Sequence, residues 1–518
     1  MVHKMTLREK IGQMIMAGFP AASISPEYKK LIQDYKIANT ILFSHNIINK
    51  FQVKELCAEL QQLISEHTGH NALIAVDQEG GMVTRLPEDA TNFPGAMAIA
   101  ATGNPGNAYT AGFITGIELK ALGVNVNMAP DLDINSNKRN PVIGVRSFGD
   151  NKEQVSLYGL EMMRGLGTAQ VLPVVKHFPG HGDTTVDSHI GLPVIDKSID
   201  ELMENELVPF NASIINGAEA VMTSHILFPK IEDENKPATM SRKIITGLLR
   251  EKLGFNGLVF SDCLEMDAVK KFYGTARGAL EAIKAGVNIV CISHTPELVA
   301  ETAEIVEAAV KSGDLPIETI NTSVSKILEF KQKYNSDANY DISLVGCEEH
   351  KAISKSIREE SITFVNGNGE SLPAVDSQSL FIGSYANRST LVSSSINKAF
   401  SFPEHMAKEF GGKYIITPVN PHAEEIEKVL NKAGGYSSIV YGTYNGHLNT
   451  EQIDLANRLC EINRNVIVIA LRNPYDLGMI DKRAFTFAAY EYTTLIFDAL
   501  TKIFRGNLKP AGKLNVVI

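Results

Sequence analysis

Eight short apolar segments that alternate with helix-like stretches place the strongest constraint on the fold of this chain. They are rich in Val, Ile and Leu and span residues 14–19, 39–43, 72–77, 124–130, 171–178, 220–225, 257–262 and 287–292. Because each segment is almost continuously hydrophobic, both faces of each strand are expected to be buried, as in a parallel sheet covered by helices. Between them, stretches such as 54–67 and 276–286 have apolar residues at helical spacing. The pattern predicts an α/β fold that begins with a (β/α)8 TIM-type barrel.

A second, smaller domain is predicted after the barrel, because 518 residues are too many for one ordinary core. Helical periodicity is lost around residues 331–346, where Asn, Asp and Ser become frequent. We therefore predict a catalytic barrel in 1–335, a linker region in 336–360 and a C-terminal α/β sandwich domain in 361–518. The strands predicted for its mostly parallel open sheet are 379–384, 414–419, 437–444, 465–474 and 486–493.

Charge and cysteine content limit the partners and the compartment. A formal net charge of -10 argues against a nucleic-acid partner, because the protein has no basic excess to neutralise phosphates. The five cysteines are scattered without a CxxC spacing, which predicts neither a disulfide framework nor a zinc site and fits a reducing compartment. No apolar run approaches the about 20 residues of a membrane span. We expect a cytoplasmic protein, with a secreted protein that has lost its signal peptide as the alternative.

Polar residues recur at the C-terminal ends of the predicted strands. They are Asp77, Asp131, Lys176, His177, His225 and Asp262. On a (β/α)8 barrel these ends surround one cavity, so the pattern predicts a catalytic face. For any one of them a plain polar strand terminator is a sufficient explanation, but six such residues on one edge favour a functional site.

The segment KHFPGHGDTTVDSH (176–189) follows an apolar strand and concentrates Lys, His and Asp in a loop rich in Gly and Pro. One interpretation is a metal site built from His177, His181, Asp183 and His189. No HExxH pair or close His and Cys spacing supports it, so metal binding is the minor alternative. The other interpretation is an acid/base site, in which Asp187 orients His189 two residues later and stabilises its charged form. A loop-stabilising ion pair would be the non-catalytic explanation.

This segment resembles the signature of the β-N-acetylglucosaminidases of glycoside hydrolase family 3, which ends in an Asp-x-His dyad. Further segments resemble the barrel motifs of that family in the same order: DQEGGMVTRL (77–86), GVRSFG (144–149), VMTSHILFP (221–229) and SDCLEM (261–266). SITFVNGNGESLP (361–373), LRNPYDL (471–477) and PAGKLNVVI (510–518) resemble its second domain. The resemblance covers essentially the whole chain.

The resemblance implies a retaining exo-β-N-acetylglucosaminidase that acts by double displacement on terminal β-linked N-acetylglucosamine. Asp262 would be the nucleophile, His189 the general acid/base and Asp187 its orienting partner. The glycone would be bound by Asp77, Arg85, Arg146, Lys176 and His177, although each arginine could also serve only as an ion-pair partner. No metal and no organic cofactor is expected. The implied substrates are carbohydrates, such as muropeptides of cell-wall recycling.

Two positions depart from the family pattern. Cys263 replaces the acidic residue that usually follows the nucleophile, and Val145 replaces the acidic residue that commonly precedes the arginine. Neither position carries the bond-breaking step, but both change the electrostatics around Asp262 and Arg146. Loss of a negative charge beside Asp262 is expected to lower the pKa of its carboxyl group.

Three other functions fit parts of the pattern. A β-N-acetylglucosaminide phosphorylase would pass the sugar to phosphate, which a histidine repels less than a glutamate does. A β-glucosidase-like member of the family would take its acid/base from the second domain, where Glu491 is the candidate; with the dyad present we predict a structural role for Glu491. A sugar-binding protein or cell-wall sensor without activity is disfavoured by the intact Asp262, Asp187 and His189.

Overall fold

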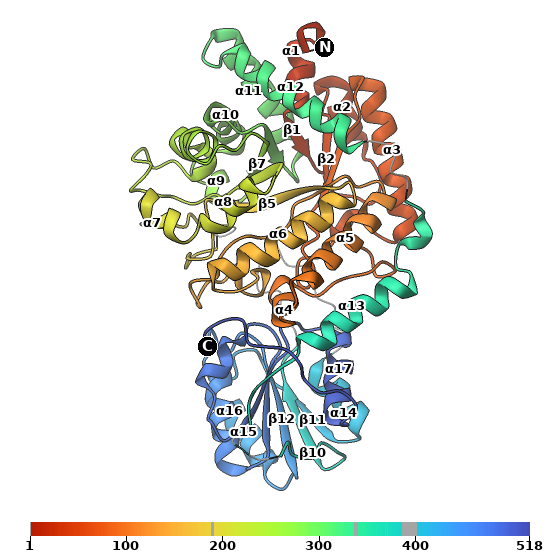
Figure 1. Ribbon diagram of the computed structural model, residues 1–518, viewed down its shortest axis with the longest axis vertical. Helices are drawn as coiled ribbons and strands as arrows, with labels where there is room; N and C mark the ends of the chain where they lie inside the picture. Colours follow the sequence, from red (N-terminus) through yellow and green to blue (C-terminus); the bar gives the residue numbers. More distant parts are fainter. Residues whose placement is uncertain (1, 188–190, 336–339, 368, 370, 386–400) are drawn as a thin grey trace.

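The computed structural model describes the whole chain apart from residues 1, 188–190, 336–339, 368, 370 and 386–400. Its first part is a closed barrel of eight parallel strands in sequence order, as predicted (Figure 1). The strands are β1 (Ile15–Ala17), β2 (Asn39–Leu42), β3 (Leu73–Val76), β4 (Val126–Asn127), β5 (Leu172–Phe178), β6 (Ala220–Thr223), β7 (Leu258–Cys263) and β8 (Ile289–Ile292). Residues of β1 pair with residues of β8, which closes the barrel.

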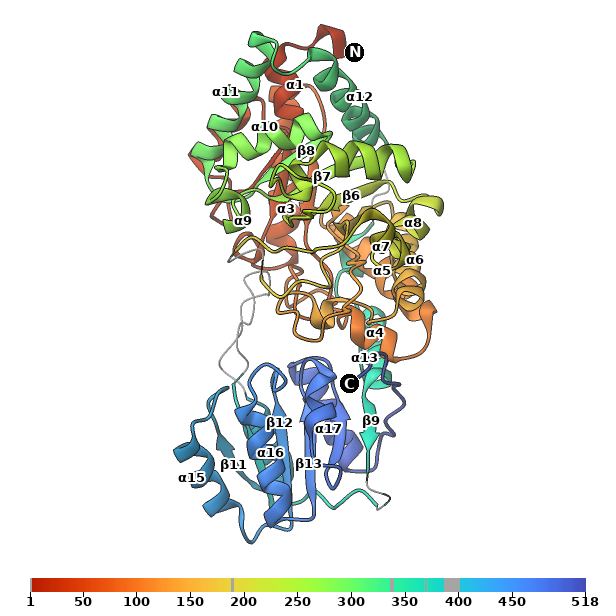
Figure 2. The same ribbon diagram turned by 90° about the vertical axis from the view of Figure 1, so that its left-hand side faces the viewer.

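Helices cover the outside of the barrel and bury the outward faces of its strands (Figures 1 and 2). They are α1 (Leu7–Gln13), α2 (Pro26–Tyr35), α3 (Lys50–Thr68), α4 (Ala96–Ala101), α5 (Pro105–Ala121), α6 (Lys152–Thr168), α7 (Ile199–Glu204), α8 (Val208–Ile215), the π-helix η5 (Lys243–Lys252), α9 (Asp267–Lys270), α10 (Thr275–Ala285), α11 (Pro296–Ser312) and α12 (Ile317–Tyr334). With helices outside and side chains packed inside, strands buried on both faces read as continuous apolar runs. The barrel thus packs one large apolar cluster, while Lys176, His177 and Asp262 lie near the C-terminal ends of its strands.

The second domain is built on a six-stranded sheet in the order β11-β10-β12-β13-β14-β9. Its strands are β9 (Thr363–Asn366), β10 (Ser379–Gly383), β11 (Lys413–Ile416), β12 (Ser438–Thr443), β13 (Val466–Ala470) and β14 (Phe485–Ala488). Five strands run parallel, as predicted, whereas β9 pairs antiparallel with β14 and was not predicted. Its sequence is short and Phe364 is exposed, so the apolar signal of a buried strand is missing.

Alternating residues of the sheet enter two separate hydrophobic clusters, which makes the domain a three-layer sandwich. On β10, Leu380 and Ile382 join one cluster and Phe381 joins the other, since successive side chains of a strand point to opposite faces. The first cluster lies under α15 (Ala423–Ala433) and α16 (Glu451–Ile462), and the second under α14 (Phe402–Phe410) and α17 (Thr494–Phe504). Figure 1 shows α15 and α16 on one side of the sheet and α14 and α17 on the other.

Helix α13 (Glu348–Ser361) begins in the predicted linker region, 336–360, and ends one residue beyond it; it packs against α4, α5 and α17. Figure 1 shows α4 and α13 together where the two domains meet. The first hydrophobic cluster of the second domain also includes Met97 and Ala98 of α4. The side chain of Asn515 donates hydrogen bonds to the carbonyl oxygens of Met97 at 2.9 Å and Phe148 at 3.1 Å. The junction is therefore a packed interface of apolar and hydrogen-bonded contacts.

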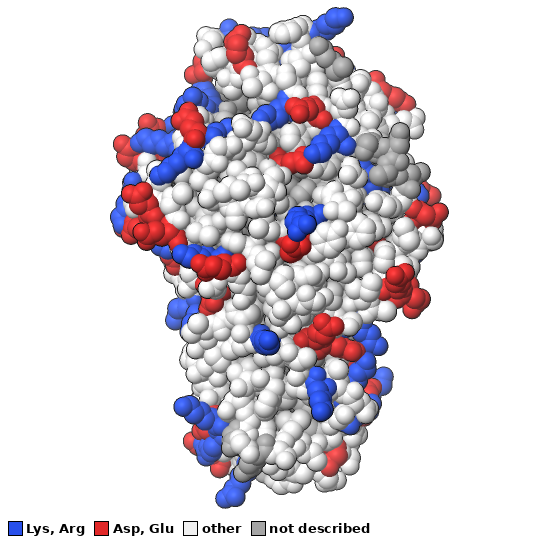
Figure 3. Space-filling model, viewed as in Figure 1, with Lys and Arg blue, Asp and Glu red and all other residues white. Residues whose placement is uncertain are grey.

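Acidic and basic side chains are interspersed over both domains on the face drawn in Figure 3. Within the described part of the chain, we find no helix that is both long and apolar enough to cross a bilayer.

Candidate active site

Lys176, near the C-terminal end of β5, contacts two acidic residues that follow β3. Its Nζ lies 2.9 Å from Oδ1 of Asp77, which follows β3, and 2.7 Å from Oε1 of Glu79. The Lys176 side chain is 1% exposed, and burial alone would lower its pKa. The charges of Asp77 and Glu79 outweigh that effect and raise the pKa of Lys176, so its ammonium group is held charged in the barrel mouth.

Arg146, on the turn that follows the loop after β4, also contacts the carboxylate of Glu79. Its Nε and Nη2 donate to the two oxygens of Glu79, each at 2.8 Å, and this bidentate pair is buried. Burial would raise the pKa of Glu79, but the charges of Arg146 and Lys176 hold it far below its usual range. Glu79 is therefore an anion that both Arg146 and Lys176 contact, and these contacts fix the orientation of both cationic side chains.

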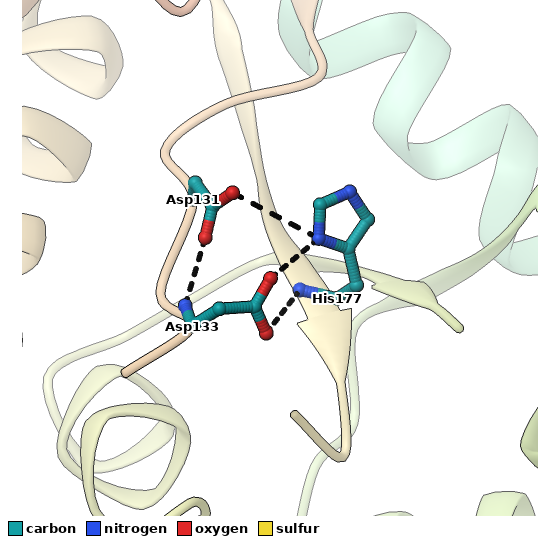
Figure 4. Close-up of side chains that lie close together, drawn as sticks. All are labelled: Asp131, Asp133 and His177. Atoms are coloured by element: carbon teal, nitrogen blue, oxygen red, sulfur yellow. Dashed lines mark hydrogen bonds and ion pairs between the residues drawn. The ribbon is translucent and has the colours of Figure 1, made fainter. Parts of the chain in front are cut away.

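A second acidic pair holds His177, as Figure 4 shows. Its Nδ1 lies 2.6 Å from Oδ2 of Asp133 and 3.9 Å from Oδ2 of Asp131. With Nδ1 donating to Asp133, the lone pair of Nε2 faces Nη2 of Arg146 at 3.3 Å and can accept from it. The chain of contacts from Arg146 through His177 to Asp133 sets the orientation of the ring.

The carboxyl group of Asp131 lies beside the contacts that join Arg146, His177 and Asp133. Burial, and then the charge of Asp133, raise the pKa of Asp131 well above its usual range. Its Oδ1 accepts the backbone N–H of Asp133 at 2.8 Å, and its Oδ2 lies 3.6 Å from Nη2 of Arg146. The neighbouring Asp133 anion thus disfavours a second negative charge on Asp131 in this buried site.

Asp131, Asp133 and His177 are also the described group whose donor atoms come within 4.8 Å of one another, as metal ligands would. The 2.6 Å contact between His177 and Asp133 is a hydrogen bond, and a shared metal would hold its donors farther apart. The guanidinium of Arg146 already supplies positive charge to Asp131. We therefore interpret the group as a hydrogen-bonded relay.

The other residues of the alternative metal set make different contacts. The backbone N–H of His181 donates to Asp133 at 2.6 Å, and its Nδ1 lies 2.9 Å from Oγ1 of Thr184. Asp183 forms an ion pair with Lys197 at 2.7 Å. His189 lies outside the described residues. In the described part of this loop, His181 is thus held by hydrogen bonds and Asp183 by an ion pair.

We expect His181 to make the stability of the barrel depend on pH. Burial, and then the charge of His177, lower the pKa of His181 to about 4, whereas an unfolded histidine titrates near 6.5. The folded form prefers the neutral ring, so this contribution is complete above about pH 6.5 and is lost as pH falls toward 4. Relative to His181→Gln, the wild-type free energy of unfolding should fall by about 2 kcal/mol between pH 7 and pH 5.

Urea denaturation of both proteins at the two pH values measures this difference. Parallel pH dependence in wild type and variant would show that His181 is not the group responsible.

Asp262 lies at the end of β7, where its Oδ1 accepts the backbone N–H of Cys263 at 2.7 Å. Burial raises the pKa of the Cys263 thiol to about 12, so the side chain beside Asp262 is neutral. Burial also raises the pKa of Cys291, its neighbour on β8, with further contributions from the charges of Cys263, Asp262 and Asp77. The charges of Asp262 and Asp77 thus both raise the pKa of the same buried thiol.

Of the predicted glycone site, Lys176 contacts Asp77 and Arg146 contacts His177, and Glu79 joins the two cations. Arg85 is buried on the loop after β3, where Oε1 of Gln78 accepts its backbone N–H at 2.6 Å. Asp187 is buried on the loop after β5, and its predicted partner His189 lies outside the described residues. Glu491 forms a buried ion pair with Arg358 at 3.0 Å.

Comparison with known proteins identifies the family. The profile described as Glycosyl hydrolase family 3 N terminal domain matches residues 6–330. The chain belongs to glycoside hydrolase family 3. The predicted family is confirmed, and with it the class of enzyme.

Named relatives and a solved structure each match more than half of this chain. A Beta-hexosaminidase A of Pseudoalteromonas piscicida is 36% identical over 67% of this chain and 62% of its own length, so the match spans less than two thirds of that relative. A Beta-hexosaminidase of Neisseria meningitidis is 34% identical over 56% of this chain and 81% of its own. The structure of a family 3 β-N-acetylglucosaminidase from Paenibacillus sp. str. FPU-7 superimposes with a TM-score of 0.90 at 38% identity, covering 99% of both chains.

The sequence interpretation of this family 3 site missed Glu79 and Asp133. Each lies two residues after a residue that was singled out, Asp77 and Asp131 respectively. Both are buried anions that hold the predicted ligands of the sugar in place. The available signal was a second acidic residue two positions after each strand-end aspartate.

Proposed function

We propose that this family 3 enzyme is a retaining exo-β-N-acetylglucosaminidase. The observation that carries the proposal is the group of Asp77, Arg146, Lys176 and His177 at the strand ends of the barrel, with Asp262 at the end of β7. The relatives named beta-hexosaminidase and β-N-acetylglucosaminidase support the choice of sugar.

The cation and imidazole cluster suits a polyhydroxylated ring. Lys176 and Arg146 are fixed by Glu79, and His177 is fixed by Asp133, so a sugar meets donors that are already oriented. The Asp77 carboxylate, with a side chain 14% exposed, can accept from a sugar hydroxyl while keeping its contact to Lys176. Preorganised donors of this kind can strengthen their hydrogen bonds as the ring flattens in the transition state.

In the proposed reaction, Asp262 attacks the anomeric carbon as His189 donates its proton to the departing glycosidic oxygen. A covalent glycosyl-enzyme forms, and the aglycone leaves with that proton. His189 then takes a proton from water, whose oxygen attacks the same carbon and releases Asp262. Two inversions give N-acetylglucosamine with its β configuration retained. Asp187 would hold the His189 ring and stabilise its charged form.

We further propose that the natural substrates are N-acetylglucosaminyl fragments of peptidoglycan, such as muropeptides, in a cytoplasmic recycling reaction. This rests on the resemblance to the family 3 glucosaminidases and on the cysteine pattern. A comparison of purified muropeptides with chitobiose as substrates tests it. A higher kcat/KM for chitobiose would contradict the proposal.

The activity itself is tested with nitrophenyl β-N-acetylglucosaminide and nitrophenyl β-glucoside, each with and without phosphate. We expect free β-N-acetylglucosamine as the first product and a strong preference for the acetamido sugar. Sugar 1-phosphate in phosphate buffer would identify a phosphorylase instead. A preference for the glucoside would identify a β-glucosidase, and no turnover of either would contradict a catalytic function.

The role of His189 is tested by its dependence on the leaving group. His189→Ala should lower kcat/KM for chitobiose by about 10²-fold, because a sugar alkoxide needs protonation to depart. For dinitrophenyl β-N-acetylglucosaminide, whose leaving group needs little protonation, the formation of the glycosyl-enzyme should be nearly unchanged. Asp187→Asn should show the same selectivity with a smaller effect. Equal losses on both substrates would contradict the acid role.

A further inference from the structure

The turn that carries Arg146 is packed against the second domain. This turn, η3 (Gly144–Arg146), follows the long loop after β4. The side chain of Val145 is 3% exposed and belongs to a hydrophobic cluster formed mainly by second-domain residues, among them Tyr475 and Leu477. An apolar residue at this position suits that environment, whereas the acidic residue common in the family would bury a charge there.

A hydrogen-bonded relay connects the same turn to the second domain. The backbone N–H of Gly144 donates to Oδ1 of Asn135 at 3.0 Å. Nδ2 of Asn135 then donates to the phenol oxygen of Tyr475 at 2.6 Å. Asn135 is 1% exposed, so both bonds are shielded from water. The orientation of the Asn135 amide, and with it the Gly144 backbone, therefore depends on Tyr475.

The backbone of the turn also touches a second-domain side chain directly. Gly144 has a φ of +47°, and a Cβ built on it would lie 2.5 Å from Oδ1 of Asn473. Asn473 is itself held by a hydrogen bond from its Nδ2 to Oδ1 of Asn445 at 3.0 Å. Glycine is thus required on the barrel side because the Asn473 side chain occupies the adjoining space.

We propose that the loop containing Asn473 and Tyr475 is a positioning element for Arg146, through which the second domain sets affinity for the glycone. The loop does not touch the sugar in this proposal; it holds the turn whose last residue lies against Glu79 and His177. The statement about affinity rests on the proposed function, because it takes Arg146 as a ligand of the sugar. The position of the turn itself depends only on the contacts of Val145, Asn135 and Gly144 with the second domain.

Tyr475→Phe tests the relay, because it removes one hydroxyl group and keeps the ring in its cluster. We expect faster amide hydrogen exchange in residues 142–148 and a KM for nitrophenyl β-N-acetylglucosaminide raised by about 5- to 10-fold, with kcat changed by less than about 2-fold. Tyr414→Phe removes an exposed hydroxyl on the edge strand β11 and serves as the control. Unchanged exchange in Tyr475→Phe would overturn the proposal, as would faster exchange with an unchanged KM.

A rescue across the domain interface separates positioning from general damage. Gly144→Ala should raise KM by about 10-fold or more, since its Cβ meets Asn473 and its φ is positive. Adding Asn473→Ala removes the colliding atoms and should recover part of the lost affinity. If the double variant were no better than Gly144→Ala, the direct contact would not position the turn. If wild type released no N-acetylglucosamine, the proposed function would fail, and the exchange data would still decide whether the second domain holds the turn.

Discussion

Asp262→Asn is expected to lower the turnover of nitrophenyl β-N-acetylglucosaminide by at least ~10⁴-fold while leaving the fold intact. The amide has the shape of the carboxylate but is too weak a nucleophile to form the glycosyl-enzyme. Its oxygen can still accept the backbone N–H of Cys263, the contact that Oδ1 of Asp262 makes now. The loss should therefore appear in kcat, with stability close to that of wild type.

Steady-state kinetics and thermal melting of Asp262→Asn measure both quantities. Asp267→Asn is the matched control, because Asp267 lies five residues later and forms a partly exposed ion pair with Lys271. A 5-fluoro analogue of the substrate, which slows hydrolysis of the intermediate, should label the peptide that contains Asp262. Turnover within 100-fold of wild type, or a label on another carboxylate, would rule out Asp262 as the nucleophile.

Glu79→Gln is expected to lower the free energy of unfolding by about 3 to 5 kcal/mol, because it removes one partner from a buried ion-pair network. Glu79 is the shared anion of Arg146 and Lys176, both of which are buried. The neutral amide would leave these two cations facing each other with less compensation. The same change should raise KM, since both predicted sugar ligands lose the group that orients them.

The effect of Glu79→Gln should depend on pH in a defined direction. The folded-state pKa of Glu79 lies far below the value near 4.3 of an unfolded glutamate, so its contribution is complete above about pH 5. It is lost as pH falls toward the depressed folded pKa, and the difference between wild type and variant should shrink below about pH 4. Urea denaturation across this range measures it, with the exposed Glu88→Gln on the same loop as control. A difference of less than about 1 kcal/mol at pH 7 would contradict the role assigned to Glu79.

The arrangement of the barrel could be predicted because each strand can be recognised from its own short stretch of sequence. A strand buried on both faces must be apolar along its whole length, and all eight segments were recognised from that property. Where the rule does not hold, the prediction was less accurate. Strand β9 is short and partly exposed at the edge of its sheet, and β4 comprises only Val126–Asn127 within the longer apolar segment 124–130.

The site was predicted in part for the same reason. Strand-end position identified Asp77, Lys176 and His177, whereas Glu79 and Asp133 are distinguished only by which cation or ring they face. The dyad of Asp187 and His189 stays a prediction from the motif.

The sequence by itself determined the two-domain α/β architecture and the family, because hydrophobic periodicity and short motifs are local properties of the chain. Only the tertiary structure decided which charges share a partner and why Val145 is apolar. Glu79 meets Arg146 67 positions away, and Asn135 meets Tyr475 340 positions away. Such contacts are set by the packing of one domain and of one domain on the other, and they leave no periodicity in the sequence.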